Sequence, residues 1–322
     1  MIEKITPSAT WKLRATIAGL FLLICLAGLG PYARGEAVFP ADKQAYYDAL
    51  AATETPTQQK ISTRLLAVVA GWDPVNHERL RGGEIVWEGL PGQSRILVGT
   101  FMSRTTYQNY YAPYLHQPEY HLTKSLWVTV VPELKNFFIG QTCPPSKERV
   151  RQLLGLNPAY AFEVFLEMWV NPADLFRPSP DPENNDHEAM LAGQTAPGNW
   201  TFPQDGNPFI RVDDSALFLE AAWLAPKTFK QWFINRAETI YHRDGDDPAG
   251  WGDPWTRLGY TYDWGNPTDP VGASEFILRI HPDTKDLVIK LEKAVDADTP
   301  DWSAYFKCFY NAWFPLIFKN DQ

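Results

Sequence analysis

The sequence is poor in cysteine and has fewer basic than acidic side chains. Its three cysteines allow one intramolecular disulfide at most, and it stays open whether Cys143 and Cys308 are bridged or are two separate buried thiols. Neither has a histidine near it in the sequence that would make it a nucleophile. The balance of 29 basic against 38 acidic side chains, with no basic stripe, argues against binding to nucleic acid or to an anionic membrane surface.

Signatures of nucleotide-dependent and common hydrolytic enzymes are also absent. No glycine pattern typical of a phosphate-binding or dinucleotide-binding loop occurs. A nucleophile elbow would need glycine where Phe276 stands, and the His187-Glu188 pair lacks the second histidine of a zinc helix. The sequence therefore gives no reason to expect a cofactor.

Three polar clusters come closest to a metal site, but each is better explained as a loop. His116, Glu119 and His121 combine imidazoles with a carboxylate, yet the proline among them would break the helix that such a motif needs. The acidic stretches 179–188 and 244–247 lack the residue pattern of a calcium loop. We predict no metal centre.

The one long apolar run lies near the N-terminus. Lys4, Lys12 and Arg14 precede an uncharged run over residues 15–30, and small residues follow near position 35. This order is typical of a secretory signal peptide, and the run is short for a membrane span. We predict a signal peptide over residues 1–35 and export to the periplasm or the extracellular space; an uncleaved N-terminal membrane anchor is the alternative. Cleavage would remove four basic side chains and one acidic one, leaving 25 basic and 37 acidic side chains. We expect no membrane binding by the cleaved protein.

The rest of the chain, residues 36–322, has no internal repeat, flexible linker or block of like charge, which indicates a single domain. Apolar residues at helical spacing predict an N-terminal helical hairpin within residues 36–72. Residues 171–210 are rich in proline and have no sustained period, so we expect a long irregular excursion there.

The predicted elements combine into an α+β fold: a mostly antiparallel sheet of about six strands with helices packed on one face. Strands are predicted as a hairpin at 84–89 and 94–101, at 125–131, at 161–170, and as a second hairpin at 255–264 and 273–280. Helices are predicted at 41–53, 57–70 and 142–156, after Pro226, and from Thr299 onward.

The second predicted hairpin is the most informative region for function. With strand 255–264 paired to 273–280, Tyr260 and Tyr262 face the core and the opposite face is polar. The strand at 161–170 has a polar face of similar composition. If these strands are neighbours, their aromatic rings and carboxylates share one surface that can hold a sugar or another small ligand. The predicted ligand-binding residues are Arg257, Thr261, Asp263, Glu275, Glu163, Glu167 and Trp169.

Three functions remain under consideration. The leading hypothesis is an exported protein that binds a small or glycan-like ligand on this face. The alternative is a carboxylate-dependent, glycosidase-like hydrolase, with Asp263, Glu275, Glu163 and Glu167 as candidate carboxylates. Glu163 and Glu167 lie about 13 Å apart along one strand, too far for the pair that glycosidases use, so the pair must come from two strands. The third hypothesis is a non-catalytic interaction protein of the cell envelope. The polar face is then the solvent side of a one-sided sheet. No catalytic residue is assigned, and the oligomeric state is left open.

Three phrases of the chain, LWVTVVPELKNFF, DLFRPSPDPE and PWTRLGYTYDWGNP, resemble a family of exported bacterial proteins of unknown function. The resemblance spans about residues 94–280. It implies export and one shared domain, and it brings no activity, substrate or catalytic residue with it.

Overall fold

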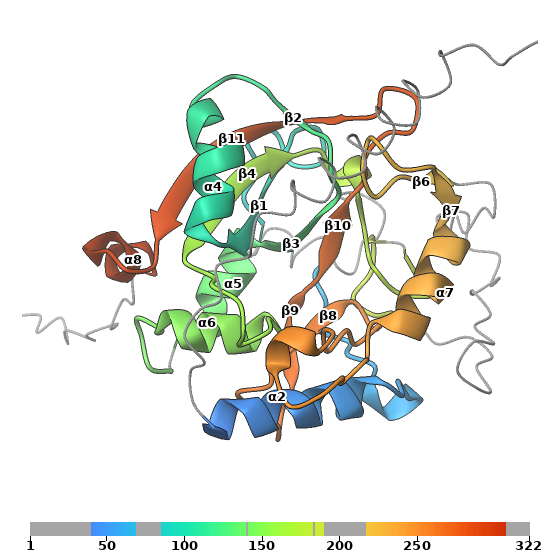
Figure 1. The fold of residues 1–322 in the computed structure, drawn as a ribbon. Coiled ribbons are helices and arrows are strands. Elements are labelled where there is room, and N and C mark those ends of the chain that lie inside the picture. The colour runs from blue at the N-terminus through green and yellow to red at the C-terminus, as the bar shows by residue number, and fades with distance from the viewer. Residues whose placement is uncertain (1–39, 69–84, 140, 183, 190–216, 307–322) are drawn as a thin grey trace, which may run out of the picture.

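The structure is a computed structural model that describes residues 40–68, 85–139, 141–182, 184–189 and 217–306. At its centre lies a seven-stranded sheet with the order β2-β11-β4-β1-β3-β10-β5 (Figure 1), and all neighbouring strands are antiparallel. The strands are β1 (Ile96–Met102), β2 (Tyr120–Leu122), β3 (Leu126–Val130), β4 (Val164–Val170), β5 (Leu175–Phe176), β10 (Phe276–Leu278) and β11 (Leu287–Asp296).

The sheet is buried on both faces, because its central strands carry apolar residues on both sides. Val98 of β1 lies opposite Met168 of β4 and Val130 of β3, and the three side chains belong to one core cluster. Leu97 and Phe165 alternate with them and belong to a second cluster on the opposite face. A strand buried on both sides has an almost continuous apolar run, as in the sequence VFLEMWV of β4.

Most of the described helices cover this second face. α5 (Val131–Phe137), α6 (Lys147–Leu153) and α8 (Pro300–Tyr305) pack against it around Leu97 and Phe165. α7 (Phe229–Thr239) packs on the same face near β3 and β10, against Trp127 and Ile277, which are paired across those strands. The first face is covered by α4 (Arg104–Tyr110) and by an extended segment before residue 69. The fold class is therefore α+β, as the sequence predicts.

Local sequence signals set the ends of these helices. The backbone N–H of Arg149 donates to Ser146 Oγ at 3.1 Å at the start of α6, and Gly155 follows the helix with a φ of 67°, a conformation that favours glycine. Thr228 and Gln231 form a capping box at the start of α7. A proline in the first turn opens both α5 and α8.

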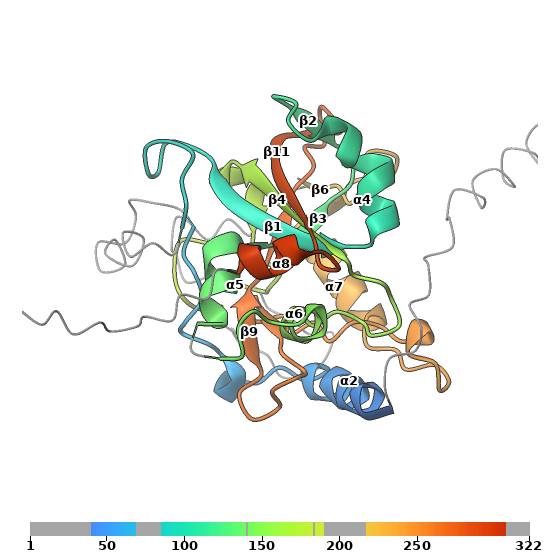
Figure 2. The same ribbon diagram turned by 90° about the vertical axis from the view of Figure 1, so that its left-hand side faces the viewer.

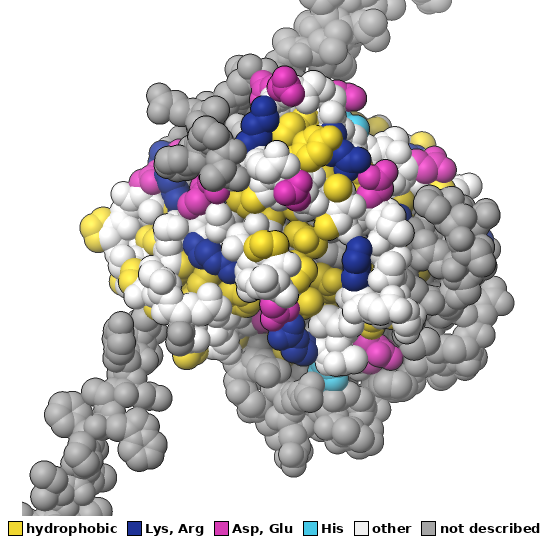
Figure 3. Space-filling view, turned by 90° about the horizontal axis from the view of Figure 1, so that it is seen from below, with side chains coloured by type: hydrophobic (Ala, Val, Ile, Leu, Met, Phe, Trp, Pro, Cys, Tyr) yellow, Lys and Arg dark blue, Asp and Glu magenta, His cyan; other side chains and the backbone are white. Residues whose placement is uncertain are grey.

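Two small sheets and the helix α2 complete the described fold. β6 (Leu217–Phe218) pairs with β7 (Lys227–Thr228), and β8 (Tyr260–Tyr262) pairs with β9 (Val271–Ser274). α2 (Pro40–Thr53) runs across the base of the molecule below β8 and β9 (Figures 1 and 2). It packs Tyr46 and Leu50 against Trp251 and Trp264. Acidic and basic side chains are interspersed with apolar surface over this base (Figure 3).

The first predicted N-terminal helix is present as α2, but the helix predicted after it does not form. Residues Gln58–Lys60 make one 3-10 turn, η1, and residues 61–68, which we call the strap, are extended. The backbone of the strap bonds to a distant segment: the N–H of Leu65 donates to His187 O at 3.0 Å, and that of Val68 to Asn184 O at 2.7 Å. The spacing of its apolar residues favours a helix, but these long-range hydrogen bonds hold the strap in an extended conformation.

The strands predicted at 94–101, 125–131 and 161–170 are present as β1, β3 and β4. The strand predicted at 84–89 is reduced to an isolated bridge between Trp87 and Ile96, and the second hairpin pairs differently. β8 lies beside β9, with Tyr260 opposite Ser274, while β10 leaves that hairpin and joins the main sheet beside β3. The change occurs at Glu275, whose N–H donates to Gly259 O at 2.9 Å. No element was predicted where α4, α5, β2 and β11 lie. The predicted signal segment and residues 190–210 of the excursion lie outside the described residues.

Candidate ligand-binding site

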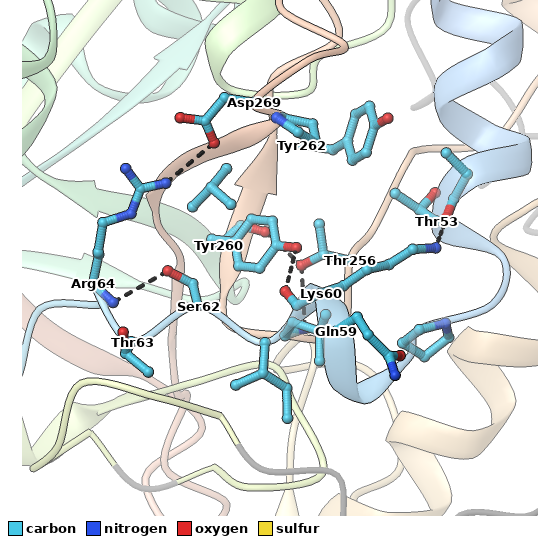
Figure 4. A pocket seen from close by; sticks show the side chains of 16 residues that line it. Thr53, Gln59, Lys60, Ser62, Thr63, Arg64, Thr256, Tyr260, Tyr262 and Asp269 are labelled. Atoms are coloured by element: carbon cyan, nitrogen blue, oxygen red, sulfur yellow. Dashed lines mark hydrogen bonds and ion pairs between the residues drawn. The ribbon is translucent and has the colours of Figure 1, made fainter.

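A cavity of about 420 Å³ lies between the segment that follows α2 and the β8–β9 hairpin (Figure 4). One wall comes from the end of α2 and from residues 56–64, and the other from residues 256–271. The volume falls within the range of small-molecule sites. Two chain segments about 200 residues apart therefore line one ligand-sized space.

The first wall owes its shape to the way in which α2 ends. Pro56 follows the helix and cannot continue it. Lys60 folds back, and its Nζ donates to Ala52 O at 2.7 Å and to Thr55 O at 2.9 Å. A cation is favourable at these carbonyl groups because they are the negative end of the helix dipole. This contact fixes η1 beside the end of α2 and forms one side of the cavity.

The strap continues this wall and is anchored from its other side. The N–H of Leu66 donates to Ser274 Oγ at 2.8 Å, and the fully buried guanidinium of Arg177 donates to Leu66 O at 3.1 Å. At the mouth of the cavity, Arg64 Nη2 lies 3.2 Å from Asp269 Oδ1 (Figure 4). Both partners of this ion pair are exposed, so it contributes little to stability.

The second wall is built on β8. The hydroxyl of Tyr260 donates to Lys60 O at 2.9 Å, which joins the two walls, and Thr256 Oγ1 donates to Tyr260 O at 2.6 Å (Figure 4). Burial raises the pKa of Tyr260 to about 12. Burial also raises the pKa of Tyr262, the next tyrosine on the same side of the strand. Both side chains are therefore neutral phenols at physiological pH.

The lining mixes apolar surface with polar groups, and its charged side chains are engaged elsewhere: Arg64 pairs with Asp269, and Lys60 Nζ donates to the carbonyl groups at the end of α2. Ile61, Leu258 and Val271 supply aliphatic surface beside the two tyrosines, while Gln59 and Thr63 are among the hydrogen-bonding side chains. Among the described lining residues the one carboxylate is that of the ion pair at the mouth. Such a lining suits an uncharged ligand that has an apolar face and hydroxyl groups at its edges.

Two of the predicted site residues, Arg257 and Glu275, lie in one group that we call the charge cluster: Arg236, Tyr241, Asp253, Arg257 and Glu275. Electrostatic interactions link these side chains. Arg257 is 2 % exposed, and its φ of 58° is uncommon for a residue other than glycine. Its guanidinium lies 4.9 Å from the ring centre of Tyr241.

Arg257 also connects the charge cluster to the cavity. Its Nη2 donates to Glu54 O at 2.7 Å and to Thr53 O at 3.4 Å, and Thr53 lines the cavity. The end of α2 thus receives two cationic side chains, Lys60 on the cavity side and Arg257 on the cluster side. Both satisfy carbonyl groups that the helix leaves without intrahelical partners.

Glu275 differs from the other predicted carboxylates because no counter-ion among the described residues is in contact with it. Part of its side chain is exposed, but Oε2 is enclosed and has no hydrogen-bond partner. Burial raises its pKa to about 8; the positive charge of Arg236 opposes this shift and the carboxylate of Asp253 reinforces it. Glu275 is therefore mostly a neutral acid at pH 7. Asp253 itself is exposed and accepts a long hydrogen bond of 3.5 Å from the Tyr46 hydroxyl.

Thr261 and Asp263 do not join this cluster, since they point toward α6 and are buried there. Thr261 Oγ1 donates to Leu153 O at 2.7 Å. The carboxylate of Asp263 is fully buried and makes a two-point ion pair with Arg149, at 2.7 Å to Nη1 and 2.5 Å to Nη2. Both contacts fasten α6 to β8, so these two side chains hold the hairpin in place.

The three predicted residues of the strand at 161–170 lie elsewhere, because β4 pairs with β1 and β11 and not with β8. Each has a structural partner. Glu163 Oε1 lies 3.1 Å from Arg104 Nη1, Glu167 Oε1 lies 3.4 Å from Lys135 Nζ, and Trp169 Nε1 donates to Glu292 Oε2 at 2.8 Å. The expected common surface of carboxylates and aromatic rings is therefore not formed. β8 belongs to a separate sheet, and the corresponding face of β4 is covered by helices.

Sequence reasoning missed the strap and Arg236, although the sequence holds a signal for the latter. Arg236 stands on the same helical stripe as the buried Trp232 and Phe233 of α7, and a charged residue on an apolar stripe needs a polar partner or a function. The prediction that Tyr260 of β8 belongs to the core is confirmed, since it is buried in a cluster with Leu65 and Leu258. Tyr262 packs against the cluster of Trp251 and Trp264. Both tyrosines also line the cavity, which the sequence did not indicate.

Other features bear on metal binding and on the compartment. In the part of the chain that the structure describes, no three His, Cys, Asp or Glu side chains converge as metal ligands would. His121 of the predicted metal-like loop instead pairs with Asp286, at 2.6 Å between Nδ1 and Oδ2.

Cys143 is disulfide-bonded, and Cys308 lies outside the described residues. Of the described helices, none is long and apolar enough to cross a bilayer.

Comparisons with protein-family models, with curated proteins and with solved structures find no match to this chain. The geometry of the cavity and of the charge cluster is therefore the basis on which a function can be argued.

Proposed function

We propose that this protein binds a small, uncharged, sugar-like ligand in the cavity between the strap and β8. One observation carries the proposal: a cavity of about 420 Å³ whose lining includes two neutral tyrosines together with hydroxyl and amide side chains. Aromatic rings stack on the apolar face of a sugar, and side-chain hydroxyl and amide groups replace the water bound to its hydroxyls. We further propose that the protein acts after export, as its N-terminal segment predicts.

Binding is better supported than hydrolysis. A glycosidase needs two carboxyl groups about 5 to 9.5 Å apart beside the scissile bond. Of the described residues that line the cavity, only Asp269 carries a carboxylate, and it is paired with Arg64 in solvent. Of the four carboxylates considered for hydrolysis, Asp263, Glu163 and Glu167 are held in ion pairs. The glycosidase-like alternative therefore depends on Glu275 alone.

Thermal denaturation of the purified protein with a panel of mono- and disaccharides tests the proposal. A ligand that binds only the folded state stabilises it by about 2.7 kcal/mol at a hundred times its Kd, so at least one sugar is expected to raise the Tm. Failure of every sugar in the panel to raise the Tm at 50 to 100 mM would count against a sugar site.

Two variants locate the binding. Val271→Phe reduces the volume of the cavity and Thr63→Trp narrows its mouth, so both should weaken sugar binding by at least about tenfold. Thr105→Trp places the same large side chain on the exposed side of α4, away from the cavity, and should bind as the unaltered protein does. Circular dichroism checks that each variant is folded. Equal binding by all three folded variants would show that the ligand binds outside the cavity and would refute the assignment.

A further inference from the structure

The two oppositely charged side chains at the mouth of the cavity come from opposite walls. Arg64 belongs to the strap, and Asp269 belongs to the turn between β8 and β9. Both residues line the cavity. Figure 4 shows the two side chains facing each other, joined by a contact of 3.2 Å between Nη2 and Oδ1. A ligand that fills the cavity therefore lies next to both charges.

Each side chain uses only one of its polar atoms in this contact. In the part of the chain that the structure describes, neither the guanidinium of Arg64 nor the carboxylate of Asp269 makes a second hydrogen bond. The two side chains are 64 % and 58 % exposed, so a ligand can reach their remaining polar atoms. The pair therefore offers N–H donors and carboxylate acceptors side by side.

The backbone that carries the pair is held in place, although both side chains are exposed. The N–H of Arg64 donates to Ser62 Oγ at 3.2 Å, and the next residue, Leu65, is buried. Asp269 precedes Pro270, whose ring restricts the backbone of both residues. Groups on a fixed backbone lose less conformational entropy when they bind a ligand. The mouth is thus partly organised for binding before a ligand arrives.

The chemistry of the pair matches two hydroxyl groups on adjacent carbon atoms. A carboxylate accepts a hydrogen bond from one hydroxyl, and a guanidinium donates one to the oxygen of the other. Both bonds are stronger than those between neutral groups, because each has one charged partner. The contact of 3.2 Å between the two side chains is close to the spacing of two oxygens on adjacent carbons, so one edge of a sugar ring can bond to both. The opposite charges balance, which keeps the site suited to an uncharged ligand.

We propose that Arg64 and Asp269 determine which ligand the cavity accepts, by binding a vicinal diol: two free hydroxyl groups on neighbouring ring carbons. The inference rests on the proposed function and narrows the ligand to sugars and cyclic polyols that carry such a pair. The apolar face of the ring packs on the tyrosines of β8, and the diol edge lies at the mouth. A ring whose hydroxyls are not adjacent reaches only one of the two partners.

Two isomers of a simple ring diol test this selection. The trans-1,2 and trans-1,4 isomers of cyclohexanediol have the same atoms and differ in the spacing of their hydroxyl groups. Titrations of the purified protein followed by nuclear magnetic resonance give a Kd for each isomer. The unaltered protein should bind the 1,2 isomer about tenfold more tightly, because the 1,4 isomer loses one charge-assisted hydrogen bond.

Substitutions in the ion pair should remove this preference. Arg64→Gln and Asp269→Asn should each bind the 1,2 isomer about as weakly as the 1,4 isomer, and their affinity for the 1,4 isomer should stay close to that of the unaltered protein. An exposed ion pair contributes little to stability, so both variants should fold. Arg95→Gln and Glu88→Gln make the same changes of charge in an ion pair that does not line the cavity, and both should keep the preference.

The outcomes separate this inference from the proposed function. Equal binding of the two isomers by the unaltered protein, or binding of neither, would overturn the selection of a vicinal diol. An equal loss of affinity for both isomers in Arg64→Gln and Asp269→Asn would also overturn it, since the ion pair would then only hold the mouth in shape. Val271→Phe should weaken binding of both isomers; unchanged binding would place the diol outside the cavity. A sugar that raises the Tm while the isomers bind equally would remove only this inference and leave the proposed function standing.

Discussion

Replacing Glu275 by glutamine should make the protein more stable at high pH and leave it unchanged at low pH. The reason is the difference in proton affinity between the two states. An ordinary glutamate has a pKa near 4.5, as in the unfolded chain, while burial raises the pKa of Glu275 to about 8 in the fold. Below pH 4.5 the residue is protonated in both states and its ionisation has no effect on stability.

Between pH 4.5 and 8 the unfolded chain releases this proton while the folded protein retains it, so stability falls as the pH rises. Above pH 8 both states are ionised and the loss is complete. Each tenfold difference in proton affinity corresponds to about 1.4 kcal/mol, which sets an upper limit of about 5 kcal/mol for the loss. Because part of the Glu275 side chain is exposed, solvent screening reduces the expected loss to about 2 kcal/mol.

Urea denaturation at pH 4.5, 7 and 9 measures this effect directly. The free energy of unfolding of Glu275→Gln should equal that of the unaltered protein at pH 4.5 and exceed it by about 2 kcal/mol at pH 9, with an intermediate difference at pH 7. Asp253→Asn is the comparison, since it removes a nearby carboxylate that is exposed, and its effect should be smaller. A Glu275→Gln protein that is less stable than the unaltered one at pH 9 would refute the reasoning, because it would mean that the ionised carboxylate has a stabilising partner.

Two further substitutions test the contacts that position the cavity. Asp263→Asn should lower the free energy of unfolding by about 3 kcal/mol, since it leaves Arg149 without its buried counter-ion; a loss below about 1 kcal/mol in urea denaturation would contradict this role. Gly259→Ala should cost more than about 2 kcal/mol, because φ is 73° and a Cβ would lie 2.5 Å from Arg177 Cδ. Gly245→Ala, with φ 69° and no atom within 4 Å of the added Cβ, should lose only the backbone contribution of about 1 kcal/mol in the same assay. If both glycine variants lost a similar free energy of unfolding, the contact between the added Cβ and Arg177 would not be the cause.

The elements that the sequence predicts well are those whose local pattern and tertiary environment agree. β4 has a near-continuous apolar run because helices and other chain segments bury both of its faces, and α2 has apolar residues at helical spacing because one side rests on Trp251 and Trp264. In such segments the spacing of the apolar residues follows directly from which side chains are buried, so it predicts the element. The sheet, its mostly antiparallel pairing and the helices on one face follow from these segments.

The candidate site was harder to predict, because its contacts join residues far apart in the chain. Hydrophobicity assigns Tyr260 to the core and Asp263 to a polar surface. The partner of Asp263 is Arg149, 114 residues away, and that of Tyr260 is the backbone of Lys60, 200 residues away. Burying a charged residue is acceptable only beside its counter-ion, and neither partner can be identified from the local pattern. Glu275 was predicted as a site residue, while Arg236 beside it was not.

The hydrogen bond from Tyr260 to Lys60 also has a consequence for the order in which the molecule is assembled. Synthesis begins at the N-terminus, so α2 and the strap emerge long before the hairpin that they cover. The walls of the cavity cannot meet until nearly all of the described chain has been made, and closing so long a loop is slow. The binding site is thus among the last parts of the molecule to appear. A proteolytic cut within the strap should remove ligand binding while the seven-stranded sheet stays folded.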